Sequence, residues 1–268
     1  MTVMFTALSI AGSDPSGGAG VQGDLKTFAR HGVYGMAVIT AVTVQNTCGV
    51  RGVHDVPAEF VREQLEAVLD DMPVGAAKTG MFSLPETLDA VAGVLQRRRV
   101  PHLVVDPVMA ATSGDALLRD DTVERIRERM LPLATLVTPN IPEAERLTGL
   151  EIASVGEMHR AARALRELGA KSILLTGGHL EGGHVVDLLH SEGAFHELSD
   201  PRIPGPPVHG TGCALAAAIT AHLARGMALM EAVAAARAYV RAGIEGARAL
   251  GKGAAPINHL ATSGSGSA

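Results

Sequence analysis

Aromatic residues are scarce in this chain of 268 residues, which has five Phe, two Tyr and no Trp. Proteins that hold single-stranded nucleic acid stack its bases on aromatic side chains, so the scarcity argues against that class. Basic residues are outnumbered by acidic ones, 23 against 28, and the formal charge of −5 offers no positive footprint for nucleic acid or an anionic membrane. Neither partner is expected. A phosphorylated small molecule remains compatible, because backbone N–H groups can hold phosphate in an acidic protein.

Cysteine is also rare. Cys48 and Cys213 are the two present, and they form neither a CxxC pair nor a Cys/His cluster with zinc spacing. Apolar runs stay shorter than the roughly 18 residues of a membrane span, and the N-terminal segment lacks the basic region of a signal peptide. These absences predict a cytoplasmic protein, since a reducing compartment suits two unpaired thiols.

What the chain does contain is an alternation of apolar, β-branched segments with segments of helical periodicity, the pattern of βαβ units and a mainly parallel sheet. Strands are predicted at 6–11, 36–44, 75–79, 102–106, 134–138 and 172–176. Helices are predicted at 19–31, 57–71, 84–99, 115–130, 142–149, 154–168, 212–226 and 229–250. The strand over 36–44 has no polar alternation, so we expect both of its faces to be covered.

A hairpin is expected near one edge of the sheet, over 183–190 and 193–198, with its turn at Glu192 and Gly193. No linker or internal repeat divides the chain. Hydrophobic residues make up 47% of it, enough for the core of one large domain. The sequence therefore predicts one domain over residues 1–261, followed by a disordered Ser/Gly tail over 262–268.

Polar or glycine-rich clusters follow one predicted strand after another. They are GSDPSGGAG at 12–20, QNT at 45–47, KTGM at 78–81, DPVM at 106–109, TPNIPEAE at 138–145 and TGGH at 176–179. In an open parallel sheet the ligand crevice lies at the carboxyl ends of the strands, so these clusters should converge. The GAGVQG string at 18–23 matches a dinucleotide fingerprint, but no acidic residue ends the following strand, and no Walker A loop is present.

The stretch 205–219, GPPVHGTGCALAAAI, runs from a Pro- and Gly-rich loop into an alanine-rich helix. The free N–H groups of a helix start attract anions, and Gly210, Thr211 and Gly212 leave the backbone open to an oxyanion. Cys213 falls in the first turn, where the helix dipole should lower the pKa of the thiol. An ordinary buried cysteine at a glycine-rich helix start is the alternative interpretation.

Asp106 and Glu143 follow two predicted strands and are the best candidates for magnesium, which takes only one or two protein carboxylates. Glu143 could equally be a first-turn acid that complements a helix dipole, and Asn140 a turn residue or a ligand contact. The Gln45 amide could read the edge of a heteroaromatic ring or be a buried amide satisfied by backbone. His209 is either a titrating group or, more commonly for a lone His, a structural one.

Taken together, eight motifs in this chain resemble the hydroxymethylpyrimidine/phosphomethylpyrimidine kinases of thiamine biosynthesis, a branch of the ribokinase-like superfamily. They are GSDPSGGAGVQGD (12–24), QNT-x-GV (45–50), KTGM (78–81), DPVMAATSGD (106–115), TPNIPEAE (138–145), GGH (177–179), HGTGC (209–213) and PINHL (256–260). The resemblance spans nearly the whole chain in the family's order. It implies a three-layer α/β/α fold with a mainly parallel central sheet, and it implies a homodimer, for which the apolar region 215–240 could supply part of the interface.

The resemblance also implies a reaction. ATP with Mg²⁺ would phosphorylate the hydroxymethyl group of 4-amino-5-hydroxymethyl-2-methylpyrimidine, and the same site would convert the monophosphate to the diphosphate. By the family's pattern the pyrimidine would be bound by Gln45, with Gly12, Ala19, Asp24, Met81 and Val108 around it. Cys213 would be the general base, and the amides of Gly210, Thr211 and Gly212 the anion hole. Asp106, Asn140 and Glu143 would serve the metal and the ATP phosphates.

Two positions depart from the family's pattern. Many members carry Lys immediately before GGH, where this chain has Thr176, and the segment before HGTGC is GPPV at 205–208 in place of a TxNT-like sequence. Both changes concern the nucleotide more than the pyrimidine. Two alternatives therefore stay open: a pyridoxal or pyridoxine kinase, and a non-catalytic pyrimidine-binding protein that has lost the use of ATP.

Overall fold

The computed structural model describes residues 4–109 and 120–261. The predicted tail over 262–268 and the first residues of the helix predicted at 115–130 lie outside the described residues. In the described part, nine strands form one sheet in the order β3-β2-β1-β4-β5-β6-β7-β8-β9. Their bounds are β1 Thr6–Ser13, β2 Tyr34–Asn46, β3 Gly49–Asp55, β4 Ala76–Thr79, β5 Leu103–Val105, β6 Leu136–Val137, β7 Ile173–Leu175, β8 His184–Ser191 and β9 Ala194–Pro201.

The middle of the sheet, from β2 through β7, is parallel, whereas β3 pairs antiparallel with β2, and β8 and β9 form an antiparallel hairpin beyond β7. The six predicted strands and the predicted hairpin are thus confirmed. Helices separate the parallel strands. They are α1 Gly20–Arg30, α2 Ala58–Asp71, α3 Pro85–Arg97, α4 Asp120–Arg125, α5 Ile141–Thr148, α6 Val155–Glu167, α7 Thr211–Ala224 and α8 Leu229–Glu245.

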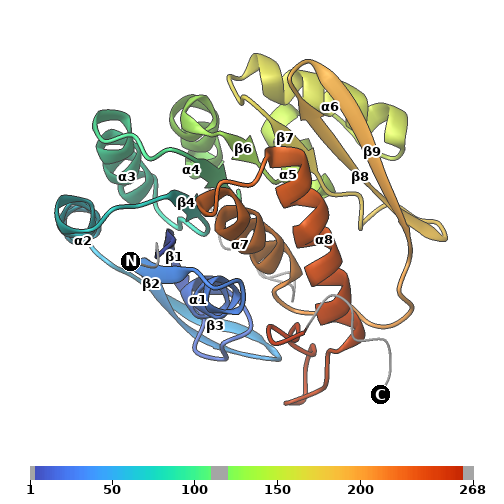
Figure 1. Cartoon of the computed structure of the whole chain (residues 1–268), viewed down its shortest axis with the longest axis horizontal. Coiled ribbons are helices and arrows are strands. Elements are labelled where there is room, and N and C mark those ends of the chain that lie inside the picture. Colours follow the sequence, from blue (N-terminus) through green and yellow to red (C-terminus); the bar gives the residue numbers. More distant parts are fainter. Residues whose placement is uncertain (1–3, 110–119, 262–268) are drawn as a thin grey trace.

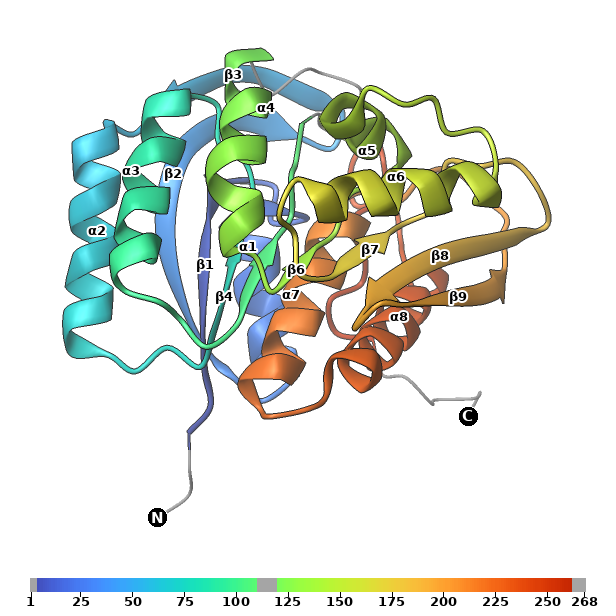
Figure 2. The same ribbon diagram turned by 90° about the horizontal axis from the view of Figure 1, so that it is seen from above.

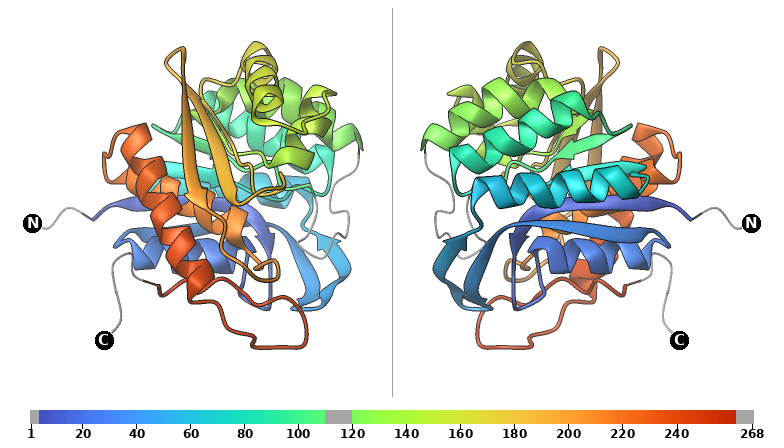
Figure 3. Two further views of the ribbon diagram at one scale, coloured as in Figure 1. Left: turned by 90° about the vertical axis from the view of Figure 1, so that its right-hand side faces the viewer. Right: turned by 90° about the vertical axis from the view of Figure 1, so that its left-hand side faces the viewer.

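Helices cover both faces of the sheet, which confirms the three-layer α/β/α arrangement (Figures 1 and 3). Helices α2 to α6 pack on one face through a large cluster of buried aliphatic side chains, and α1, α7 and α8 pack on the other. Every residue of α7 from Ala214 to Leu223 is buried. A helix that is apolar all round belongs in the interior, so α7 cannot supply the dimer surface expected over 215–240.

Local signals explain where several helices begin and end. Asn140 and Glu143 form a capping box at the start of α5, and Gly149 ends that helix in the left-handed conformation at φ 73°. Ser154 caps α6 by accepting a hydrogen bond from the Glu157 amide. Helix α8 ends at Glu245, five residues before the predicted end at residue 250.

Strand β2 departs from its prediction. Its first half is covered, with Met36 and Val38 buried, but Val42 and Val44 are 43% and 55% exposed. The reason is that β2 runs past the sheet and continues as a two-stranded ribbon with β3, which the sequence analysis missed (Figure 2). The predicted QNT cluster therefore lies at the end of this ribbon, and Gln45 is part of the strand itself.

A histidine pair lies between the end of α1 and α7, away from the strand ends described below; His222 is buried and His31 is half-buried. The His31 ring meets the His222 ring at 4.5 Å and the Tyr239 ring at 4.7 Å between centroids. Nε2 of His31 and both ring nitrogens of His222 make no hydrogen bond within the described residues. Burial and the neighbouring cations lower the pKa of His31 to about 4, and burial lowers that of His222 as well.

We expect this pair to make the fold sensitive to acid. Because the folded state holds these pKa values below the ordinary 6.5, the unfolded chain binds more protons, and stability falls as the pH drops from 6.5 toward 4. His31→Phe keeps an aromatic ring and removes one titrating group, so it should flatten this fall in urea unfolding followed across pH. His196→Phe, at an exposed position, is the control. An unchanged slope in His31→Phe would contradict the assignment.

Candidate active site

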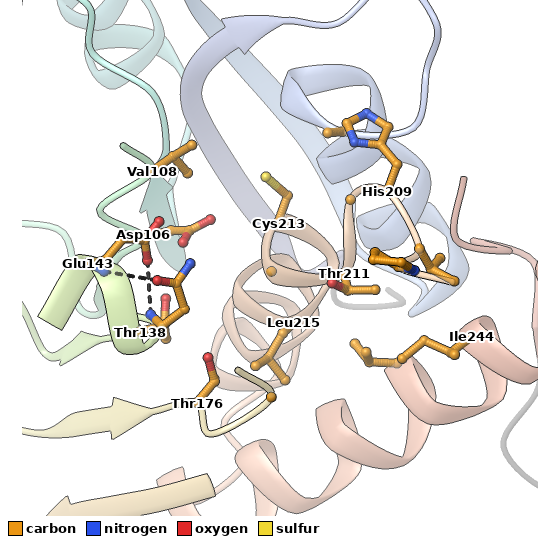
Figure 4. A pocket seen from close by; sticks show the side chains of 18 of the residues that line it. Asp106, Val108, Thr138, Glu143, Thr176, His209, Thr211, Cys213, Leu215 and Ile244 are labelled. Atoms are coloured by element: carbon orange, nitrogen blue, oxygen red, sulfur yellow. Dashed lines mark hydrogen bonds between the residues drawn. The ribbon is translucent and has the colours of Figure 1, made fainter. Parts of the chain in front are cut away.

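The polar clusters predicted from the sequence converge at the carboxyl ends of the parallel strands, where they line a cavity of about 870 Å³ (Figure 4). Each of the six strand-end clusters and the stretch 209–213 contributes to its wall. One end of the cavity lies against β2 and the loop after β1, and the other against β8, β9 and α8. A single crevice therefore collects the residues that the sequence singled out.

At the centre of the cavity, α7 starts with the geometry predicted for an anion site. Gly210 adopts φ 86°, and a Cβ at this position would lie 2.0 Å from the Gly18 carbonyl oxygen, so only glycine fits. No side chain caps the helix, and Ala214 is the first residue whose amide bonds back to Gly210. The amides of Thr211, Gly212 and Cys213 are therefore not used within the helix and can hold an oxyanion.

Cys213 is half-buried in the first turn of α7, with Asp106 and Glu143 on the facing wall (Figure 4). The predicted lowering of its pKa is wrong. Burial raises the pKa of this thiol to about 12, and the Asp106 and Asp24 carboxylates add to the rise, although Lys78 opposes it. The prediction considered only the helix dipole, which lowers the pKa of the thiol. In the folded protein, desolvation and two carboxylates raise this pKa by more than the dipole lowers it. In this charge state the thiol keeps its proton at neutral pH.

Glu143 takes the role that the sequence analysis held as its alternative. Its carboxylate accepts a hydrogen bond of 2.9 Å from the Asn140 amide, and the Asn140 side chain accepts one of 2.9 Å from the Glu143 amide. Both residues nevertheless line the cavity. Burial and the nearby Asp106 carboxylate raise the pKa of Glu143 to about 8.

Asp106 is buried, and burial also raises its pKa, while Lys78 and a hydrogen bond with Cys213 lower it. Its Oδ2 atom makes no hydrogen bond within the described residues, nor does the buried Thr138 hydroxyl beside it in the cavity wall. Two adjacent buried carboxylates with an unbonded oxygen fit a divalent cation. The described residues contain no group of three or more His, Cys, Asp or Glu that could hold a metal, so such an ion would complete its shell with water and phosphate.

Asp24 does not reach the cavity, in contrast to its expected place beside the pyrimidine. It is fully buried behind Lys78, whose Nζ lies 3.0 and 3.2 Å from the two carboxylate oxygens, and the Ser9 hydroxyl donates to it at 2.5 Å. Lys78 is fully buried as well, and although burial lowers its pKa, the attraction of Asp24 and other anionic neighbours raises it above the ordinary value. Asp24 therefore holds Lys78 in place and does not line the cavity.

The other residues predicted around the pyrimidine do line one end of the cavity: Gly12, Ala19, Gln45, Met81 and Val108. Gly12 makes room for Met81, because a Cβ at Gly12 would lie 2.6 Å from the Met81 Cε. The Gln45 amide lies 3.2 Å from the Thr43 hydroxyl and 3.5 Å from the His209 ring. Thr43 and Asp14, which contacts His209, were not predicted as site residues. The only sequence signal for Asp14 is its place in the loop after β1.

At the opposite end, Thr176 follows β7 with its hydroxyl toward the cavity, as Figure 4 shows. Arginines line this end, and their side chains are held by neighbours. Arg237 pairs with Asp187 and Asp200 at 2.8 and 2.9 Å, Arg202 donates to the carbonyls of the 178–182 turn, and Arg241 donates to the Pro201 carbonyl at 2.7 Å. Apolar side chains complete the wall. They are Val208, Leu215, Val240 and Ile244, together with Pro206 and Pro207 of the 205–208 segment, which differs from the family's pattern.

Comparisons with known proteins agree with this geometry. The family model for phosphomethylpyrimidine kinase matches residues 14–258. A Rhizobium meliloti hydroxymethylpyrimidine/phosphomethylpyrimidine kinase is 52% identical, with 95% of this chain and 96% of that protein covered. The Geobacter sulfurreducens thiamine biosynthesis bifunctional protein ThiED is 51% identical over 95% of this chain, which spans only 52% of that longer relative.

Two solved structures extend the comparison. The crystal structure of phosphomethylpyrimidine kinase from Clostridium difficile is 43% identical, with a TM-score of 0.81 over 90% of this chain and 99% of that one. Staphylococcus aureus pyridoxal kinase in complex with AMP-PCP and pyridoxal is 34% identical, with a TM-score of 0.90 over 97% of this chain and 95% of that one. The match to the family model and the near-complete coverage of the curated relatives show that this chain belongs to the phosphomethylpyrimidine kinase family.

Proposed function

We propose that this protein transfers the γ-phosphoryl group of ATP to the hydroxymethyl oxygen of 4-amino-5-hydroxymethyl-2-methylpyrimidine, and then phosphorylates the monophosphate to the diphosphate. The observation that carries the proposal is the placement of the α7 start in the middle of one cavity. Gln45, whose amide can bind the edge of a heteroaromatic ring, lies at one end of the cavity, and apolar and arginine side chains lie at the other. The carboxylates of Asp106 and Glu143 lie opposite the free amides of α7.

The carboxylate pair is the proposed place of Mg²⁺, with Asp106 as the ligand and Glu143 beside it. Asp106 Oδ2 makes no hydrogen bond within the described residues, and its ion-pair partner Lys78, at 3.5 Å, is shared with Asp24. Together with the raised pKa of Glu143, this indicates that negative charge is in excess at this wall. Asp106 and Glu143 would hold Mg²⁺ there, and the ion would supply positive charge that offsets both carboxylates and the ATP phosphates. Thr211, Gly212 and Cys213 would receive the oxygens of the transferred group through their amides, which are fixed before the reaction begins.

Cys213 is the proposed acceptor of the alcohol proton, because its side chain is the group of α7 that faces the cavity between the amides and Asp106. It can act only as the thiolate, so the thiol must first lose its proton to solvent. A cation that offsets the charge of Asp106 would make that loss easier, because this carboxylate helps to raise the pKa of the thiol. The alcohol oxygen forms its bond to phosphorus as the bond to ADP breaks, and the alcohol proton passes to the thiolate sulfur, which becomes a thiol. The second phosphorylation has an ionised phosphate as its nucleophile and requires no base. This difference separates a proton acceptor from a residue that merely shapes the site.

Pyridoxal is the second candidate substrate. The fold is similar to that of a pyridoxal kinase at a TM-score of 0.90, and pyridoxal also carries a hydroxymethyl group on a heteroaromatic ring. The higher identity to the pyrimidine kinases, 52% against 34%, favours the pyrimidine. A homodimer in the cytoplasm is also proposed. Exposed Val42 and Val44 on the β2–β3 ribbon could supply apolar contact area, and the two free cysteines suit a reducing compartment.

We expect ADP release with ATP and Mg²⁺ when the pyrimidine is supplied, and a smaller rate with pyridoxal. The measurement is a coupled assay on a panel of the two compounds and the pyrimidine monophosphate, with mass spectrometry of the products. Turnover of pyridoxal without turnover of the pyrimidine would overturn the substrate assignment. Binding of the pyrimidine without any ATP-dependent product would instead identify a non-catalytic binding protein.

Cys213→Ala should lower turnover of the alcohol by roughly 10²–10⁴-fold and that of the monophosphate much less, because only the alcohol has a proton to lose. Single-turnover rates with each substrate measure the difference. Cys213→Ser, which keeps a polar hydrogen-bonding group, is the matched control for shape. Equal losses on both substrates would rule out the proton-acceptor role.

Thr176→Lys should increase the affinity for ATP by roughly tenfold, since it adds a cation to the wall that the family's pattern assigns to nucleotide phosphate. The KM for ATP and the KM for the pyrimidine should separate in this variant, with only the first one falling. Thr176→Met, of similar length and without charge, is the control. A KM for ATP that does not change would mean that the existing arginines already neutralise the phosphates.

A further inference from the structure

The His209 imidazole lies beside the start of α7, where three segments of the cavity wall meet (Figure 4). Its Nε2 atom is 2.9 Å from Asp14 Oδ2 and 3.5 Å from the Gln45 amide atom that is assigned as Nε2. Its backbone amide donates to the Ala255 carbonyl, and its carbonyl accepts from the Ile257 amide, so the C-terminal segment holds the residue from behind. The ring is buried, with 8% of the residue exposed. His209 therefore has little freedom to move.

Asp14 decides which nitrogen of this ring carries a proton. Its Oδ1 accepts from the amide and the hydroxyl of Ser16 at 2.9 and 2.7 Å, and its Oδ2 accepts from the Ala19 amide at 2.9 Å. Although burial raises the pKa of Asp14, the hydrogen bonds from His209 and Ser16 lower it to about 2. An ionised carboxylate can only accept, so the Nε2 atom that faces it must be an N–H donor.

This assignment fixes the orientation of the Gln45 amide. The Thr43 hydroxyl has one proton, which it donates to the Ser13 carbonyl at 2.9 Å, so toward Gln45 it can only accept. With the Gln45 nitrogen toward His209 and its oxygen toward Thr43, a donor faces a donor and an acceptor faces an acceptor. Turning the amide by half a rotation removes both conflicts: the nitrogen donates to Thr43, and the oxygen lies 3.5 Å from His209 Nε2. There it shares the single Nε2 proton, whose main acceptor is Asp14 at 2.9 Å.

We propose that His209, held by Asp14, is a positioning residue that sets the Gln45 amide with its oxygen on the side of the α7 anion site. The inference deepens the proposed function and rests on it. In the aminopyrimidine, the amino donor neighbours the carbon that bears the hydroxymethyl group, and the ring-nitrogen acceptor lies on the amino group's other side. An amide oxygen on the His209 side receives the amino group there, and the hydroxymethyl group then points toward Gly210 and Cys213. The reverse amide orientation would direct it away.

The test is the affinity for the pyrimidine in the absence of ATP, measured by calorimetry on the full chain, together with kcat and KM. His209→Phe keeps the ring and removes the donor, and it should weaken binding of the pyrimidine by roughly 10–100-fold. His209→Gln, which can present an N–H at a similar distance, should lose much less. The KM for ATP should be unchanged in both variants. Unaltered pyrimidine binding in His209→Phe would overturn the inference.

His259 provides a matched control. It is a buried histidine in the C-terminal segment that holds His209, and it also contacts the loop after β1. Its Nε2 lies 3.0 Å from the Gly18 carbonyl oxygen and its Nδ1 lies 3.2 Å from the Thr27 hydroxyl, but it neither lines the cavity nor touches Gln45. His259→Gln should leave the pyrimidine affinity within about twofold of the parent, since no contact to the subsite is lost. A loss as large as that of His209→Phe would mean general loosening of the loop, and the inference would fail.

A double-mutant cycle with Gln45→Ala separates action through Gln45 from a structural effect. If His209 acts by orienting that amide, His209→Phe should change kcat/KM for the pyrimidine little in the Gln45→Ala background. Fully additive losses would contradict the inference. If the parent protein binds no pyrimidine, the proposed function is refuted. If the parent and His209→Phe bind the pyrimidine equally well, only the positioning role is refuted.

Discussion

The close approach of Gly210 to the Gly18 carbonyl is the constraint on which the rest of the site depends. The loop after β1 and the start of α7 touch backbone to backbone there, with no space for a side chain at Gly210. From Ala214 to Leu223, helix α7 is buried by the sheet and by α1 and α8, so the helix cannot shift to relieve the contact at its start. The free amides are therefore held rigidly, as an anion site that acts without rearrangement requires.

A group of buried charged side chains lies next to the first turn of α7. Asp24 fixes Lys78 from behind, and Lys78 in turn lies 3.5 Å from Asp106, the carboxylate of the cavity wall. Since one ammonium serves two carboxylates and Glu143 lies close by, negative charge is in excess on this wall. The same excess raises the pKa of the Cys213 thiol and suits the wall to a divalent cation. Both properties come from the same buried charges.

Features that depend on neighbouring residues in the chain could be predicted from the sequence, whereas features that depend on contacts between distant segments could not. The capping box of Asn140 and Glu143 spans four residues and could be anticipated as a first-turn acid, and each predicted cluster lies at the carboxyl end of its strand, although the QNT cluster begins inside β2. Strand β3 was missed because GVRGVHD has two glycines and no alternation, and only pairing with β2 makes it a strand. Asp24 matched its motif, yet Lys78, 54 residues away, holds it behind the cavity.

By itself, the sequence determined the order of the six parallel strands and of the helices, the three-layer α/β/α arrangement, the convergence of the clusters and the family. Periodicity, turn residues and the order of motifs are properties of the linear sequence, so they can be recognised without the structure. Only the tertiary structure decided the protonation of Cys213, the withdrawal of Asp24 from the cavity, the burial of α7 and the contact of Asp14 with His209 across 195 positions. The physical reason is that desolvation and charge–charge interaction depend on distances between side chains from remote segments, which no local pattern records.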